Sequence, residues 1–233
     1  MKRIQKHNTM KTTRLYTPFA LLMVFAVSCN KPDEPDNHEY VDLDLPSGTL
    51  WATCNVGSNT PEGYGNYFAW GEITSKTTYN WSTYKYCNGD YNQLTKYCNY
   101  SSYGYNGFTD NLTTLKASDD AATANWGRKW CMPTQHQWEE LYSYTTYVWT
   151  TQNGVNGRLF TSTNGNSIFL PAAGDFKDDA IERIGEFGLY GSSSLANNEA
   201  CTAFGFNFYS GNLGMSGYAR CHGRSIRPVR STK

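Results

Sequence analysis

The alternation of aromatic and polar residues near the end of the chain is its clearest secondary-structure signal. Phe204, Phe206 and Phe208 are each separated by one smaller or polar residue. Because successive side chains of a strand point to opposite faces, these three phenylalanines share one face. The pattern predicts a strand with a buried phenylalanine face, while Asn207 and Tyr209 are displayed on the opposite face.

Other short apolar or alternating stretches predict further strands. They are followed by Gly, Pro or Asn, which favour turns. Asn153-Gly154 and Asn164-Gly165 are typical of tight turns between strands. The predicted strands before the last quarter are 40–45, 50–56, 67–71, 148–151, 157–160 and 167–170.

One helix is predicted by its start signal. Thr134 is followed three residues later by Gln137, which forms a capping box, and Pro133 comes directly before it. An apolar stripe at helical spacing follows and can pack on a sheet. The stripe consists of Trp138, Leu141 and Tyr142. A weaker helical start is at 118–124.

Residues 76–110 are nearly all Tyr, Asn, Ser, Thr and Gly and have no regular period. Such a stretch predicts ordered loops, which are often functional. Helices that precede a run of short strands favour an α+β fold. Since no internal repeat and no second linker is present, we expect one domain over 40–233, with twisted antiparallel strands, one or two helices and long loops.

The first 28 residues are predicted to be a signal peptide. Lys11 and Arg14 precede the apolar run 19–27, which is too short to span a bilayer permanently. Met10 is an alternative start to Met1. The run ends just before Cys29, which resembles a bacterial lipoprotein processing site with Cys29 as the lipidated residue. The alternative is an ordinary cleaved signal.

Residues 29–39 are polar, contain two prolines and are predicted to be a flexible tether. Their acidic residues, soon after Cys29, resemble the surface-export signal of Bacteroidetes lipoproteins. The expected location is therefore the outer membrane, with a lipid anchor and the domain facing the exterior.

Charge argues against nucleic acid as a partner. Five of the 20 basic residues lie in the first 28 positions, which contain no acidic residue. The remainder therefore has 15 basic and 20 acidic groups, a net charge of about −5. A general nucleic-acid binder needs many cationic phosphate contacts, which this balance does not supply.

Several strings in order resemble the Fibrobacter succinogenes major paralogous domain, which is abundant in Bacteroides surface lipoproteins. They include V-D-L-D-L-P-S-G-T-L-W-A-T-C-N-V-G, Y-F-A-W-G-E and G-R-S-I-R-P-V-R. Their positions are 41–57, 67–72, 132–141, 164–174, 191–195 and 223–230. The resemblance implies a C-type-lectin-like fold related to that of the formylglycine-generating enzyme. Some proteins of that wider fold are diversified near the C-terminus by retroelements.

The chain departs from that family's pattern at a few positions. Gly191 stands where the family commonly has Trp, and Cys131 stands where Arg is common. Cys201 and Cys221 are outside the usual pattern.

Six cysteines follow Cys29, and they allow fifteen pairings. An exported chain favours disulfides. The nearest partners along the sequence are Cys87 with Cys98 and Cys201 with Cys221. No C-x-x-C or H-x-x-H spacing is present, so a zinc site is not predicted.

We predict no metal and no cofactor, with calcium as an alternative at the acidic loop 175–179. Asp175, Asp178 and Asp179 offer oxygen ligands there, but Lys177 interrupts them and their spacing is not that of a calcium loop. A solvated loop is the competing interpretation.

The displayed face of the C-terminal region is the candidate ligand surface. Tyr provides rigid contact area, and Asn provides adaptable hydrogen bonds. The predicted ligand-binding residues are Asn207, Tyr209, Asn212, Tyr218, Arg220 and His222. We expect the neighbouring Arg224, Arg227 and Arg230 to pair with acidic residues of the early strands.

These features predict a non-catalytic, surface-exposed lipoprotein that binds a glycan or a protein. One alternative is an oxidase of the formylglycine-generating type that uses Cys201 and Cys221. Another is a structural component of a surface assembly.

Overall fold

The computed structural model describes residues 37–197 and 199–231. The predicted signal peptide, Cys29 and residues 30–36 of the predicted tether lie outside the described residues. The described residues belong to one compact unit, Asp33–Lys233. Among them, no helix is long and apolar enough to cross a membrane.

The predicted α+β class is confirmed, and the described residues form several small sheets without a closed barrel. The helices are α1 (Ala121–Trp126) and α2 (Gln135–Tyr144), with short 3-10 turns at Trp81–Thr83, Ser101–Tyr103, Tyr105–Gly107 and Ala117–Asp119. The strands are β1 (Tyr40–Asp42), β2 (Thr49–Ala52), β3 (Tyr67–Phe68), β4 (Thr146–Gln152), β5 (Val155–Thr161), β6 (Ser167–Pro171), β7 (Asp175–Lys177), β8 (Ala180–Glu182), β9 (Gly188–Leu195), β10 (Thr202–Phe208), β11 (Leu213–Ala219), β12 (Arg224–Ser225) and β13 (Val229–Ser231).

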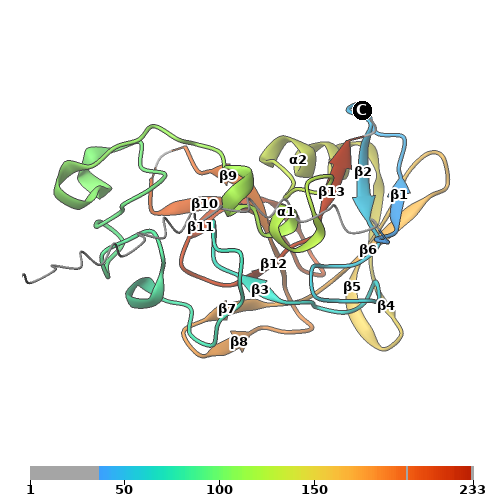
Figure 1. Cartoon of the computed structure of the whole chain (residues 1–233). Coiled ribbons are helices and arrows are strands. Elements are labelled where there is room, and N and C mark those ends of the chain that lie inside the picture. The colour runs from blue at the N-terminus through green and yellow to red at the C-terminus, as the bar shows by residue number, and fades with distance from the viewer. Residues whose placement is uncertain (1–36, 198, 232–233) are drawn as a thin grey trace, which may run out of the picture. The chain divides into compact units, whose positions relative to one another are not determined.

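The central sheet has five strands in the order β11-β10-β9-β12-β3. Three-stranded sheets β1-β2-β13 and β4-β5-β6 lie to its right in Figure 1, and the loops of 76–116 lie to its left, in green. β2 pairs with both β1 and β13, with Trp51 opposite Val229. The two ends of the domain are therefore joined in one sheet.

Helix α2 begins as the capping box predicts. Thr134 and Gln137 bond to each other's backbone N–H groups at 3.2 and 3.0 Å. Trp138 is fully buried and stacks on Phe206 of β10, with ring centroids 4.8 Å apart. Phe206 and Phe208 are buried as predicted. Phe204 is only half-buried, because a β-bulge shifts the register of β10 against β9 at this point.

β9 is a strand that the sequence pattern does not reveal, because it is buried on both faces and does not alternate. Gly191 lies within it, and a Cβ there would stand only 2.8 Å from Ile226 Cδ1.

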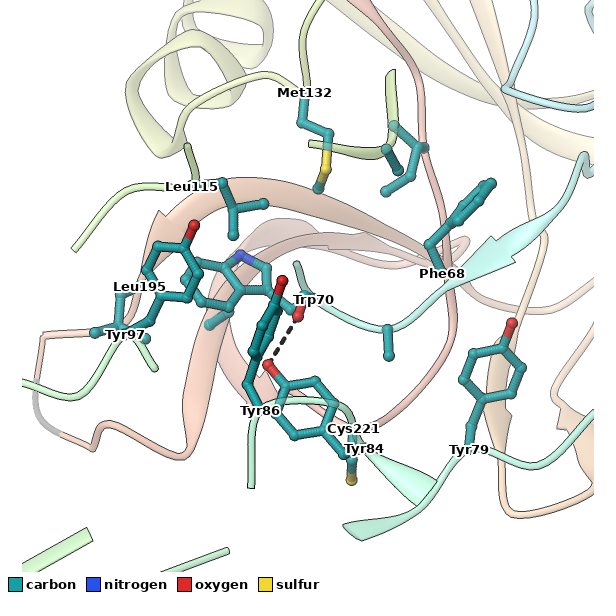
Figure 2. Packing of buried hydrophobic residues seen from close by; sticks show 14 of the residues in the cluster. Phe68, Trp70, Tyr79, Tyr84, Tyr86, Tyr97, Leu115, Met132, Leu195 and Cys221 are labelled. Atoms are coloured by element: carbon teal, nitrogen blue, oxygen red, sulfur yellow. Dashed lines mark hydrogen bonds between the residues drawn. The ribbon is translucent and has the colours of Figure 1, made fainter. Parts of the chain in front are cut away.

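A second core cluster lies between the central sheet and the green loops. Figure 2 shows the aromatic rings of Trp70, Tyr84, Tyr86 and Tyr97 packed together in it. The Tyr84 hydroxyl donates to the Trp70 carbonyl at 2.8 Å, the dashed line in Figure 2. Buried tyrosines of this kind let a polar loop region contribute to a core while each hydroxyl keeps a partner.

Asp119 holds this loop region from within. Its carboxylate accepts hydrogen bonds from the hydroxyls of Tyr86 at 2.8 Å and Tyr97 at 2.5 Å, and it pairs with Lys96. Burial opposes ionisation, but these three donors outweigh it and lower the pKa of Asp119 to about 2. The predicted loops are therefore ordered by a buried charge.

Arg227 fastens the C-terminal segment to the N-terminal strands, but not through the carboxylates that the sequence suggests. Its fully buried guanidinium donates to the carbonyls of Ala52, Thr53 and Phe169 and to Asn55 Oδ1. Five N–H donors in a planar fork suit this use. In the described part of the chain, no carboxylate lies within ion-pair distance of Arg227.

Replacing Arg227 with Ala would leave these buried acceptors without donors. Each unsatisfied buried group costs about 1–3 kcal/mol, so we expect Arg227→Ala to lower the free energy of unfolding by about 3 kcal/mol or more. The exposed Arg128 is the matched control, and Arg128→Ala should change stability by less than about 0.5 kcal/mol. Urea unfolding followed by tryptophan fluorescence measures both, and equal losses would contradict the assignment.

Candidate functional site

An open cleft of about 510 Å³ lies at one end of the central sheet. Three segments distant in sequence form it: the β10–β11 turn, the β4–β5 hairpin and the turn between β8 and β9. Its lining residues are Trp149, Asn156, Arg183, Gly185, Glu186, Tyr209 and Ser210.

Two aromatic side chains provide the apolar part of the cleft. Tyr209 is 42% exposed. Trp149 is half-buried, and its ring meets Phe208 edge-on with centroids 6.4 Å apart. Trp149 is therefore fixed by the core, while Tyr209 is presented to solvent at the turn.

The polar part of the cleft comes from the turn before β9. Arg183 and Glu186 are exposed there, and the Arg183 guanidinium lies 3.7 Å from the Phe187 ring centroid. Asn156 donates through its side chain to the Gly185 carbonyl at 3.1 Å, which joins the β4–β5 hairpin to this turn. One positive and one negative side chain, together with an amide, thus lie in the same cleft as the two aromatic rings.

Arg158 is a buried residue that holds the β10–β11 turn in place. It is 5% exposed, and its Nη2 donates to the carbonyls of Tyr209 at 2.7 Å and Asn212 at 3.3 Å. Burial lowers the pKa of Arg158, although a guanidinium stays protonated in proteins. The turn that carries Tyr209 is therefore pre-organised by a buried cation.

The structure separates the predicted ligand-binding residues into groups. Tyr209 lines the cleft, and Asn212 is exposed in the same turn. Asn207 is half-buried, and its side chain donates across the strands to the Gly214 carbonyl at 2.9 Å. The Asn207 side chain therefore stabilises the β10–β11 hairpin and is only partly accessible to solvent.

Tyr218 and His222 lie at the opposite end of β11 from the turn. Tyr218 is half-buried, with the Arg224 guanidinium 5.3 Å from its ring centroid, and burial raises its pKa. His222 Nδ1 is 3.0 Å from Asp175 Oδ2 and so joins the C-terminal segment to β7. The candidate surface is thus not one patch.

Arg220 is wrong as a ligand-binding residue, because it is completely buried. Its guanidinium donates to the carbonyls of Lys96, Tyr97 and Ala200 and to the Tyr84 hydroxyl, and lies 4.7 Å from the Trp70 ring centroid. Arg220 joins the loop region to the sheet. It lies next to residues predicted to be exposed, and the sequence pattern therefore does not show that it is buried.

The six described cysteines are free thiols in the structure. Neither predicted pairing, Cys87 with Cys98 or Cys201 with Cys221, is formed. The Cys87 and Cys98 thiols donate instead to the backbone carbonyls of Trp81 and Tyr100, each at 3.1 Å. Disulfide formation in the exported protein stays a prediction.

The acidic loop is occupied by internal contacts. Asp175 contacts His222, and Asp178 accepts from the Asn80 side chain at 3.2 Å. Across 37–197 and 199–231, no group of three or more metal-ligating side chains is found. Calcium at this loop therefore gains no support from geometry.

Six of the cleft residues are not among those predicted from the sequence: Trp149, Asn156, Arg183, Gly185, Glu186 and Ser210. They come from segments that only the tertiary fold brings together. Trp149 alone had a usable signal, since its strand is predicted and contains no charged residue. The other five are polar or glycine residues of turns and of one strand, with no distinguishing pattern.

Cys221 tests whether the cysteines near the C-terminus are reactive. Its thiol is 1% exposed, and burial raises its pKa to about 12. Because the thiolate is the reactive form, iodoacetamide at pH 8 should label Cys221 on the order of a thousandfold more slowly in the folded protein than in urea. Peptide mass spectrometry measures the rates, and comparable labelling in both states would contradict this placement.

Comparisons of this chain with protein-family models, with curated proteins and with solved structures find no match.

Proposed function

We propose that the protein is a non-catalytic binding protein whose cleft holds a glycan, or else a segment of another protein, against Tyr209 and Trp149. The observation that carries this proposal is the cleft itself, where two rings stand beside exposed Arg183 and Glu186. Ligand sites are typically concave, with an apolar wall and a few convergent polar groups. A sugar ring presents the complementary surfaces, an apolar face and hydroxyl edges.

The rigidity of the cleft supports binding without a large ordering cost. Arg158 fixes the turn that carries Tyr209, and Asn156 fixes the turn that carries Glu186. Pre-organised side chains lose little conformational entropy when a ligand arrives. Tyr209 also has few rotatable bonds, so its ring loses little conformational entropy when it contacts a ligand.

A binding role is favoured over the oxidase alternative by the state of two thiols. Burial raises the pKa of both Cys201 and Cys221. Catalytic cysteines need the opposite shift, toward the thiolate. Neither residue lines the cleft.

The cellular context of this proposal comes from the leader. We propose an outer-membrane lipoprotein, anchored through Cys29, whose C-type-lectin-like domain faces the exterior and meets glycans or proteins there. The same context suits a structural component of a surface assembly, which recovery of stable partners from native membranes would favour. The acidic balance beyond the leader argues against nucleic acid.

Tyr209 and Tyr105 form a matched pair for testing the cleft, because each is 42% exposed and only Tyr209 lines it. On a glycan array and in cell-binding assays, followed by calorimetry, Tyr209→Ala should weaken binding by about tenfold or more, as loss of a central aromatic contact does. Tyr105→Ala should bind as the unaltered protein does.

Glu186→Gln is a second variant, which removes one exposed charge at the cleft and keeps the shape of the side chain. It should alter the selectivity among charged and neutral glycans. Binding that is insensitive to Tyr209→Ala but lost in Tyr105→Ala would place the site on the 76–116 loops and overturn the proposal.

A further inference from the structure

β4 is an edge strand whose outer side has no partner in the described residues. The sheet order β4-β5-β6 ends at β4. Gln152 and Val155 close its hairpin across the two-residue turn Asn153-Gly154. In such a hairpin the closing pair is hydrogen-bonded, and every second pair after it is bonded too.

The alternation then fixes which backbone groups of β4 face outward. Gln152, Thr150 and Val148 bond to β5, so the N–H and C=O groups of Thr151, Trp149 and Tyr147 point away from it. No backbone or side-chain hydrogen bond from the described residues reaches these outward groups. They form a regular row of unused donors and acceptors.

The strand also lacks the features that normally prevent edge pairing. Natural edges are blunted by lysine, proline, bulges or covering loops. From Leu141 to Gly157 the sequence contains no charged residue and no proline. β4 keeps a continuous register with β5, and Val148 is 55% exposed on it. The nearest carboxylate, on Glu62, bonds to Gln152 and Asn153 at the turn end only.

We propose that β4 is a self-association edge, on which a second copy of this chain pairs antiparallel around a two-fold axis at Trp149. The outward residues are centred on Trp149, so Trp149 meets the partner subunit's Trp149, and Tyr147 meets the partner subunit's Thr151. Every outward N–H then finds a C=O, and the two-fold axis closes the assembly as a dimer. Absence of charge in the strand means that no like-charge repulsion opposes self-pairing.

Such a dimer has a consequence for the cleft, which rests on the proposed function. Trp149 lines the cleft, and hydrogen-bonded antiparallel partners have Cα atoms about 5.5 Å apart. The two clefts would then adjoin across the two-fold axis. A ligand with repeated units could occupy both, with the gain in avidity that linked sites give.

Val148→Lys tests the edge with little risk to the monomer, because the side chain is already exposed. Ile181→Lys is the matched control: it makes the same kind of change on β8, where Ile181 is 37% exposed. Sedimentation velocity of the ligand-free, full chain should show a dimer for the unaltered protein and for Ile181→Lys. Val148→Lys should raise the dimer dissociation constant by at least about tenfold, the effect of about 1.4 kcal/mol.

Hydrogen exchange of the unaltered protein gives a second measurement that needs no variant. The amides of Tyr147, Trp149 and Thr151 should exchange more slowly at high protein concentration than at low concentration. A monomer at all concentrations, a dimer unaffected by Val148→Lys, or protection of these amides only when another protein is added would each overturn self-pairing. Because none of these measurements includes a ligand, their failure is distinct from failure of the cleft to bind.

Discussion

The structure depends on guanidinium groups that are buried without carboxylates. Arg220, Arg224 and Arg227 are at most 2% exposed, and none has a carboxylate within ion-pair distance in the described part of the chain. Removing a cation from water is costly. Here much of that cost is offset by backbone carbonyls, which would otherwise need water or other donors themselves.

The pairing of buried guanidinium groups with backbone carbonyls explains how so polar a chain folds into one domain. Arg220 binds carbonyls of the loop region and of the segment before β10, and Arg227 binds carbonyls of two early segments and of β6. Loops without regular hydrogen-bond ladders need partners for their backbone groups. The arginines provide those partners and leave the tyrosine rings free to pack in the core cluster of Figure 2. Arg158, which is also buried, uses the same chemistry to hold the turn of Tyr209.

The sequence predicts the local structure better than the site. The helix with the Thr134–Gln137 capping box and the turn at Asn153-Gly154 are as expected, because both are decided by neighbouring residues. β9 could not be predicted, since a strand buried on both faces has no alternation. The burial of Arg220 could not be predicted because a charged residue is normally exposed, and three of its four acceptors come from residues more than 120 positions away along the chain. Tyr209 was recognised from its strand, whereas Arg183 and Glu186 join it only through tertiary packing.

We propose that ligand binds in the cleft around Tyr209, whose turn is held by the buried Arg158. The most direct measurement is hydrogen exchange of the full chain with and without a glycan or protein that it retains. Binding in the cleft should slow exchange in 147–152, 183–186 and 209–212, with little change in 85–110. Protection confined to 85–110, with the three cleft segments unaffected, would contradict it.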